Sequence, residues 1–154
     1  MVRKSTGPVE ILLVEDNPAD VQLINLMLKQ TKLPHRMTSV GDGEAATRYL
    51  FEKVKKGDAP CPELIILDLN LPGKSGKQVL NELKSASETR GIPILIFTTS
   101  RDEEDVRRCY ELHANCYVSK PTDLARFNTV LKTIEEFWFG IAELPKQRVV
   151  TKSA

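Results

Sequence analysis

The most constraining feature of the sequence is an unbroken apolar run, residues 64–67, that leads directly into Asp68. Turn-forming residues follow, among them Pro72, Gly73 and Gly76. A continuous apolar run bounded by turn residues is typical of a strand that is buried on both faces of a sheet. Asp68 therefore stands at the carboxyl end of a buried strand, where open α/β sheets place their ligand sites. A carboxylate there is costly unless a cation or a donor pairs with it.

A strand followed by a helix recurs five times along the chain. The expected strands are residues 9–14, 36–40, 64–68, 92–97 and 115–119, and helical periodicity follows each of them. The last helix is the longest, with apolar residues at helical spacing from Leu124 to Ile141, and Pro145 is expected to end it. Right-handed crossovers then require one parallel sheet covered by helices on both faces. The sequence predicts an α/β, flavodoxin-like (βα)5 doubly wound sheet with strand order 2-1-3-4-5.

Cap residues predict where the helices begin. Asn17 before a proline is a favourable start for the first helix, which is expected to reach about Gln30. Ser75 with Gln78, and Ser100 with the residue three positions later, each form the pattern of a capping box. Thr122 is expected to cap the last helix.

Length and composition favour one ordinary globular domain. We expect one domain over residues 9–145, a flexible tail over 1–8 and a disordered tail over 146–154, with no room for a further domain after Pro145. A net charge of +1 gives no reason to expect nucleic acid or a membrane surface as a partner. No apolar run approaches the roughly 20 residues that span a bilayer, and because residues 1–10 lack an apolar stretch we do not expect them to be a signal peptide. Three cysteines without metal-ligand spacing are typical of reduced thiols, so we expect a cytoplasmic protein.

Polar residues gather at one edge of the predicted sheet. The strands end in Glu15 and Asp16, in Asp68, in Thr98 and in Lys120. Any one of these acids alone is more simply explained as a solvated loop carboxylate, but the whole set at one edge is harder to dismiss. Clustered carboxylates raise one another's pKa unless a cation intervenes, and hard oxygen ligands suit Mg²⁺. An Asp nucleophile, a metal, an amine and a hydroxyl are the parts that phosphoryl transfer to a carboxylate requires.

Four segments in this order resemble the receiver domain of two-component response regulators. They are residues 12–16 (LLVED), 67–72 (LDLNLP) with Gly76, 97–100 (FTTS) and 117–121 (YVSKP). The resemblance extends over residues 9–141. It implies that Asp68 is the phosphoacceptor, and that a sensor histidine kinase supplies the phosphoryl group. It also implies that Mg²⁺ is held by Asp68, Asp16, the backbone carbonyl of Asn70 and, through water, Glu15.

The same resemblance assigns the remaining site residues. Thr98, which lies five residues after Pro93, is the implied switch hydroxyl, and Lys120 is the implied amine that contacts the phosphate. Tyr117 fits the switch aromatic residue, and the Lys120–Pro121 peptide bond is expected to be cis. Glu15 is a departure, because an Asp is commoner there.

Further segments point to a narrower group within that family. Residues 16–20 (DNPAD), 112–117 (LHANCY) and 136–139 (EFWF) resemble the single-domain response regulators paired with cyanobacterial phytochromes. The expected kinase is therefore a phytochrome, and the downstream partner stays unidentified.

Three consecutive aromatic residues, Phe137, Trp138 and Phe139, lie near the end of the last helix. Consecutive helical residues point about 100° apart, so the three cannot all face one core. We expect a partner surface here, most simply a homodimer through this helix and its extension. The alternative is that Trp138 completes the core and one Phe lies at a frayed helix end.

The expected function is that of a phosphorylation-activated signalling switch, not an enzyme beyond its own phosphotransfer and slow autodephosphorylation. One alternative is a docking module that keeps the fold without being phosphorylated. Another is a phosphatase of the haloacid-dehalogenase type, which needs a second Asp two residues after the nucleophile. Asn70 stands at that position, which argues against the phosphatase.

Overall fold

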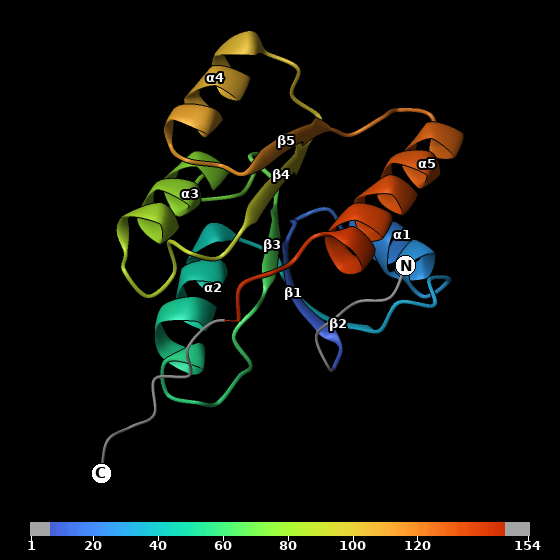
Figure 1. Cartoon of the computed structure of the whole chain (residues 1–154). Helices are drawn as coiled ribbons and strands as arrows, with labels where there is room; N and C mark the ends of the chain where they lie inside the picture. The colour runs from blue at the N-terminus through green and yellow to red at the C-terminus, as the bar shows by residue number, and fades with distance from the viewer. Residues whose placement is uncertain (1–6, 147–154) are drawn as a thin grey trace.

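Five strands form one parallel sheet, in the order β2-β1-β3-β4-β5, in the computed structural model, which describes residues 7–146 (Figure 1). The strands are β1 (Val9–Val14), β2 (His35–Val40), β3 (Leu64–Leu67), β4 (Ile94–Thr98) and β5 (Cys116–Ser119). The helices are α1 (Pro18–Leu28), α2 (Gly43–Arg48), α3 (Gly76–Ser85), α4 (Glu103–Glu111) and α5 (Leu124–Glu135). Two π-helical segments, η1 (Tyr49–Val54) and η2 (Glu136–Ile141), extend α2 and α5. The fold class and strand order predicted from the sequence are confirmed.

Most of the two tails expected at residues 1–8 and 146–154 lies outside the described residues. In the described part of the chain, no helix combines the length and the apolar character that a membrane crossing requires.

The core has two layers, one on each face of the sheet. In Figure 1, α1 and α5 cover one face, while α2, α3 and α4 cover the other. Successive side chains of a strand point to opposite faces, so Leu12 and Val14 pack with the α2–α3–α4 layer and Ile11 and Leu13 with the α1–α5 layer. All four residues of β3 are buried, as expected of a strand covered on both faces.

Two helices begin one or two residues later than the cap patterns predict. The capping box of Ser75 and Gln78 is present, and Asn17 caps α1. The prediction for α4 was wrong, because Asp102 is its N-cap and the Ser100 hydroxyl instead donates to Asp105 Oδ2 at 2.6 Å. α5 is capped by Asp123, not by Thr122. In both cases an Asp, which ranks among the best N-cap residues, stands closer to the first helical turn.

The π-helical segment η2 changes which aromatic residue faces the core. Hydrogen bonds in a π-helix join residues five apart, and Ala142 N donates to Phe137 O at 2.7 Å. Phe139, five residues after the buried Ile134, is therefore completely buried, with its ring centroid 5.5 Å from that of His35. The expectation that Phe139 lies on a partner surface was wrong. Trp138, which the alternative placed in the core, is only partly buried and packs against the core from outside. The helix ends at Ile141, before Pro145.

Candidate functional site

The carboxyl ends of four neighbouring strands bring the predicted polar residues together. Residues Val14, Leu67 and Ile96 are in register across β1, β3 and β4, and Thr98 is paired with Ser119 of β5. Because the strands are parallel, the residues that follow them emerge at one edge of the sheet. Four side chains are buried there, namely those of Glu15, Asp68, Thr98 and Lys120. Asp16 is exposed beside them.

Lys120 is the centre of this group. Its side chain is 3% exposed, and its Nζ donates hydrogen bonds to three carboxylates. They belong to Glu15, to Asp20 at 2.9 Å and to Asp68 at 3.1 Å. Burial lowers the pKa of Lys120, but the hydrogen bonds to Glu15 and Asp20 outweigh it, so its pKa lies above the usual value. The lysine therefore stays charged in the buried site.

Asp20 is a member of the site that the sequence analysis missed. It lies in the first turn of α1, four residues after Asp16. The signal was an acid one helical turn beyond the strand end, but an acid at that position is also common as a favourable charge at a helix N-terminus. Only the contact with Lys120 distinguishes the two roles.

The two buried carboxyls have opposite pKa shifts. Burial raises the pKa of Glu15 to about 7, and the nearby charge of Asp68 also raises it, although the hydrogen bond from Lys120 lowers it. Burial also raises the pKa of Asp68, but the Thr98 hydroxyl and the Lys120 ammonium outweigh it, so the net pKa lies below the usual value. Asp68 is therefore ionised at neutral pH, which is the state that a carboxylate nucleophile requires.

Three acids have the arrangement of a cation site. One carboxylate oxygen from each of Glu15, Asp16 and Asp68 lies within 4.8 Å of the other two. Asn70 lies in the same turn, and its amide donates to Asp68 Oδ1 at 3.3 Å. Oxygen ligands clustered beside open solvent suit Mg²⁺ or Mn²⁺. The residues present therefore fit a divalent cation.

Gly76 allows α3 to start close to the site. Its amide donates to Leu69 O at 3.0 Å, and a Cβ at this position would lie 2.2 Å from the backbone oxygen of Asp68. Real Cβ atoms do not approach a backbone oxygen so closely. A side chain at position 76 would therefore displace the turn that carries Asp68.

Thr98 and Tyr117 occupy different parts of the site. The Thr98 side chain is buried and lowers the pKa of Asp68, yet among the described residues its Oγ1 has no hydrogen-bond partner of regular geometry. Tyr117 is half-buried, and its hydroxyl donates to Ser100 O at 3.0 Å. Ser119 Oγ donates to the same carbonyl at 3.2 Å, so two side chains of β5 hold the loop after β4 at the Ser100 carbonyl.

The peptide bond between Lys120 and Pro121 is trans, because the described residues contain no cis peptide bond. The expectation of a cis bond was therefore wrong. The trans form is the lower in energy even before proline, by about 0.5–1 kcal/mol.

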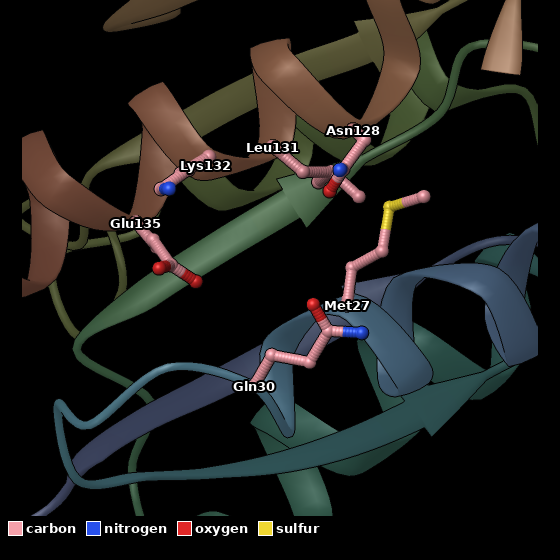
Figure 2. Close-up of a pocket in the computed structure, with 6 residues that line it drawn as sticks. All are labelled: Met27, Gln30, Asn128, Leu131, Lys132 and Glu135. Atoms are coloured by element: carbon pink, nitrogen blue, oxygen red, sulfur yellow. The ribbon is translucent and has the colours of Figure 1, made fainter. Parts of the chain in front are cut away.

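Two cavities lie beside α1. The larger, about 450 Å³, adjoins Glu15 and Asp16 and continues between α1 and the end of β2. The smaller, about 150 Å³, lies between α1 and α5, and Figure 2 shows its lining, which includes Met27, Leu131 and Glu135. The larger cavity gives access to the acidic edge, whereas none of the strand-end residues lines the smaller one.

The sequence is similar to known proteins of one family over most of its length. The family described as response regulator receiver domain matches residues 11–132. Response regulator Rcp1 of Synechocystis sp. is 41% identical over 145 residues, which cover 94% of this chain and 99% of Rcp1. The probable methanogenesis regulatory protein FilR2 of Methanothrix harundinacea is 35% identical over 139 residues, covering 90% of this chain and 89% of FilR2.

Solved structures agree with the sequence relatives. The Mn²⁺-bound form of Rcp1 matches with a TM-score of 0.85 and 41% identity, covering 90% of this chain and 99% of that one. The phosphorylated cyanobacterial phytochrome response regulator RcpA matches with a TM-score of 0.85 and 42% identity, with the same coverage.

Proposed function

The chain belongs to the response regulator receiver domain family, and from this premise we propose that it is a signalling switch phosphorylated on Asp68. One observation carries the proposal. Asp68 is a buried, ionised carboxylate that contacts the Lys120 ammonium at 3.1 Å and belongs to a trio of acids that fits a divalent cation. This is the combination that phosphoryl transfer to a carboxylate needs, namely a nucleophile with its surrounding charge neutralised.

In the proposed reaction, a partner histidine kinase presents a phosphohistidine. A carboxylate oxygen of Asp68 forms a bond to phosphorus, the phosphorus–nitrogen bond breaks, and the imidazole leaves with the electron pair and takes up a proton. Lys120 neutralises a phosphoryl oxygen, and the Thr98 hydroxyl, which has no regular hydrogen bond to any residue from 7 to 146, donates to another. Asp16, Asp68 and the Asn70 carbonyl, with Glu15 acting through water, would hold Mg²⁺, and its charge would neutralise further negative charge.

We propose that phosphorylation changes the shape of the surface formed by α4, β5 and α5. Movement of Thr98 toward the phosphoryl group would pull on the loop after β4, which Tyr117 and Ser119 hold through the Ser100 carbonyl. α4 is linked to the same loop, because Asp105 accepts a hydrogen bond from the Ser100 hydroxyl. A shift of this loop would therefore alter the surface formed by α4, β5 and α5.

The proposed partners are a phytochrome-type sensor histidine kinase and a second copy of the chain. The similarity to RcpA, a cyanobacterial phytochrome response regulator, supports the first. Phe137 and Ile141, 48% and 53% exposed at the end of the last helix, support a homodimer through that helix. Three free cysteines fit a reducing compartment such as the cytoplasm.

The two other functions are less well supported. Beyond its own phosphorylation and slow dephosphorylation, we propose no enzymatic activity. A phosphatase of the haloacid-dehalogenase type needs an acidic residue at position 70, where this chain has Asn70, whose backbone amide donates a hydrogen bond to Asp68. A docking module that is never phosphorylated has no need for a buried Lys120 among three carboxylates, an arrangement that is costly to desolvate.

Phosphotransfer from a kinase tests the proposed function. A phytochrome-type histidine kinase, autophosphorylated with labelled ATP, is mixed with the wild-type chain or with Asp68→Asn. We expect label to move to the wild-type chain within the first minutes and not to Asp68→Asn. Label that stays on the kinase, while a receiver known to accept it becomes labelled, would contradict the pairing. Equal labelling of Asp68→Asn would contradict the assignment of Asp68.

A further inference from the structure

We propose that Asp20 sets the charge that Lys120 offers to the phosphoryl group, and that it thereby slows phosphorylation of Asp68 by anionic donors. This inference rests on the proposed function, since it concerns the same site. It gives α1 a role in the reaction, because the Asp20 carboxylate offsets part of the positive charge of the Lys120 ammonium.

The contact is direct and well formed. Asp20 Oδ2 accepts a hydrogen bond from Lys120 Nζ at 2.9 Å, which is shorter than the 3.1 Å to Asp68. The lysine side chain is almost completely buried, whereas that of Asp20 is 24% exposed. Asp20 therefore joins the buried ammonium to solvent.

The position of Asp20 in α1 has a second explanation, which its contacts do not support. An acid in the first turn of a helix can bind the free backbone amides. In this helix the Asn17 side chain binds the amides of Ala19 and Asp20. Within residues 7–146, the Asp20 carboxylate accepts from Lys120 and from no backbone amide.

Asp20 also differs from the other two partners of Lys120. Glu15 and Asp68 both belong to the trio of acids that fits a cation, and Asp20 does not. Glu15 and Asp68 can therefore interact with both the lysine and a bound cation, whereas Asp20 interacts with the lysine.

The consequence follows from Coulomb's law at short range. A negative charge 2.9 Å from the ammonium reduces the attraction that the same ammonium exerts on an incoming phosphoryl oxygen. Partial exposure of Asp20 screens this effect without abolishing it. Glu15 and Asp68 keep Lys120 in place when Asp20 is neutralised, so the loss of its charge is expected to speed the reaction.

The test is the rate of phosphorylation by acetyl phosphate with Mg²⁺, followed by intact-protein mass. For Asp20→Asn we expect a rate about three- to tenfold above the wild type at low donor concentration, through a lower half-saturating concentration. The gain is expected to be smaller with phosphoramidate, which carries less negative charge than acetyl phosphate. Asp20→Glu, which restores the carboxylate, is expected to return the rate toward that of the wild type. Asp20→Ser is a second neutral variant and is expected to behave like Asp20→Asn.

Asp58→Asn is the matched control. Asp58 is exposed in the loop before β3, at the opposite end of the sheet. Its substitution therefore changes the net charge by the same amount, away from the site. The inference would be overturned if Asp20→Asn and Asp20→Ser were phosphorylated no faster than the wild type. It would also be overturned by the same acceleration in Asp58→Asn, or by an equal gain in rate with acetyl phosphate and phosphoramidate.

A second measurement separates this inference from the proposed function. If the wild type accepts no phosphoryl group, the proposed function fails. The charge of the pocket is then measured by titration with inorganic phosphate, followed through the amide NMR signals of Thr98 and Thr99. Tighter phosphate binding by Asp20→Asn than by the wild type and Asp58→Asn would support the inference. Equal or weaker binding would overturn it.

Discussion

At the scale of single residues, Glu15 and Asp68 show how one crevice gives two carboxyls different roles. Both are buried and both contact Lys120. Asp68 also faces the Thr98 hydroxyl, and its pKa falls below the usual value, whereas the pKa of Glu15 rises to about 7. The nucleophile is therefore kept ionised, and Glu15 is the carboxyl that takes up a proton first.

The raised pKa of Glu15 predicts a pH dependence of stability in the metal-free protein. Because the pKa is about 7 in the folded state and 4.5 without burial, the stabilisation is fully present below pH 4.5 and is lost as the pH rises through 7. The free energy of unfolding is expected to fall by roughly 1–3 kcal/mol between pH 5 and pH 8. Urea unfolding in EDTA at several pH values measures it.

Glu15→Gln is the control for that prediction, because it removes the titrating group and keeps the shape. Its unfolding free energy is expected to vary less over the same pH range. The lowered pKa of Asp68 acts in a different window, since its contribution is lost only as the pH falls below 3.8. Identical pH profiles for the wild type and Glu15→Gln would show that another group is responsible.

The residues that the sequence predicted well are those that follow a buried strand. Asp68 and Thr98 come directly after, or at the end of, strongly apolar runs, and Lys120 follows a short half-buried strand. The place where the three meet follows from the parallel sheet. Asp20 was missed because its role depends on how α1 is placed over the sheet. The cis bond before Pro121 was predicted only from resemblance, and nothing local to the sequence requires it.

At the scale of elements, η2 determines which aromatic side chain enters the core. Helical spacing of 3.6 residues from Ile134 selects Trp138, but the i to i+5 spacing of a π-helix selects Phe139. A π-turn has no sequence signature comparable to a cap or a proline, so its effect was not predictable here. The predicted caps of α4 and α5 were wrong because a second candidate, Asp102 or Asp123, stands one or two residues further along the chain.

Truncation of the two Phe residues of η2 is expected to have very different effects. Phe139 is completely buried against His35, so Phe139→Ala is expected to lower the free energy of unfolding by about 3–5 kcal/mol. Phe137 is 48% exposed, and its truncation is expected to cost less than about 1 kcal/mol. Chemical denaturation of both variants measures this, and similar losses would contradict the assigned π-turn.

Phe137→Ala also tests the proposed homodimer. Because the fold is expected to survive this change, analytical ultracentrifugation reports on association alone. We expect the variant to dissociate at a higher concentration than the wild type. A wild-type chain that sediments as a monomer at all concentrations, or a variant that associates equally well, would remove Phe137 from the interface.

At the scale of the whole molecule, the fold was predictable and the coupling between its parts was not. Alternating apolar runs and helical periods determine a doubly wound sheet, and that sheet places the carboxyl ends of its strands at one edge. The contacts that join this edge to the surface depend on side-chain geometry. Tyr117, Ser100 and Asp105 form such a connection from β5 to α4. The loop after β4 therefore joins the buried charged site to an exposed face.

The most direct test of the central claim is intact-protein mass spectrometry after incubation with acetyl phosphate and Mg²⁺. The account predicts that the wild type gains the mass of one phosphoryl group. It predicts no gain for Asp68→Asn, and none for the wild type in EDTA. A wild type that gains nothing under conditions that label a known receiver domain would contradict the account, as would an adduct that persists in Asp68→Asn.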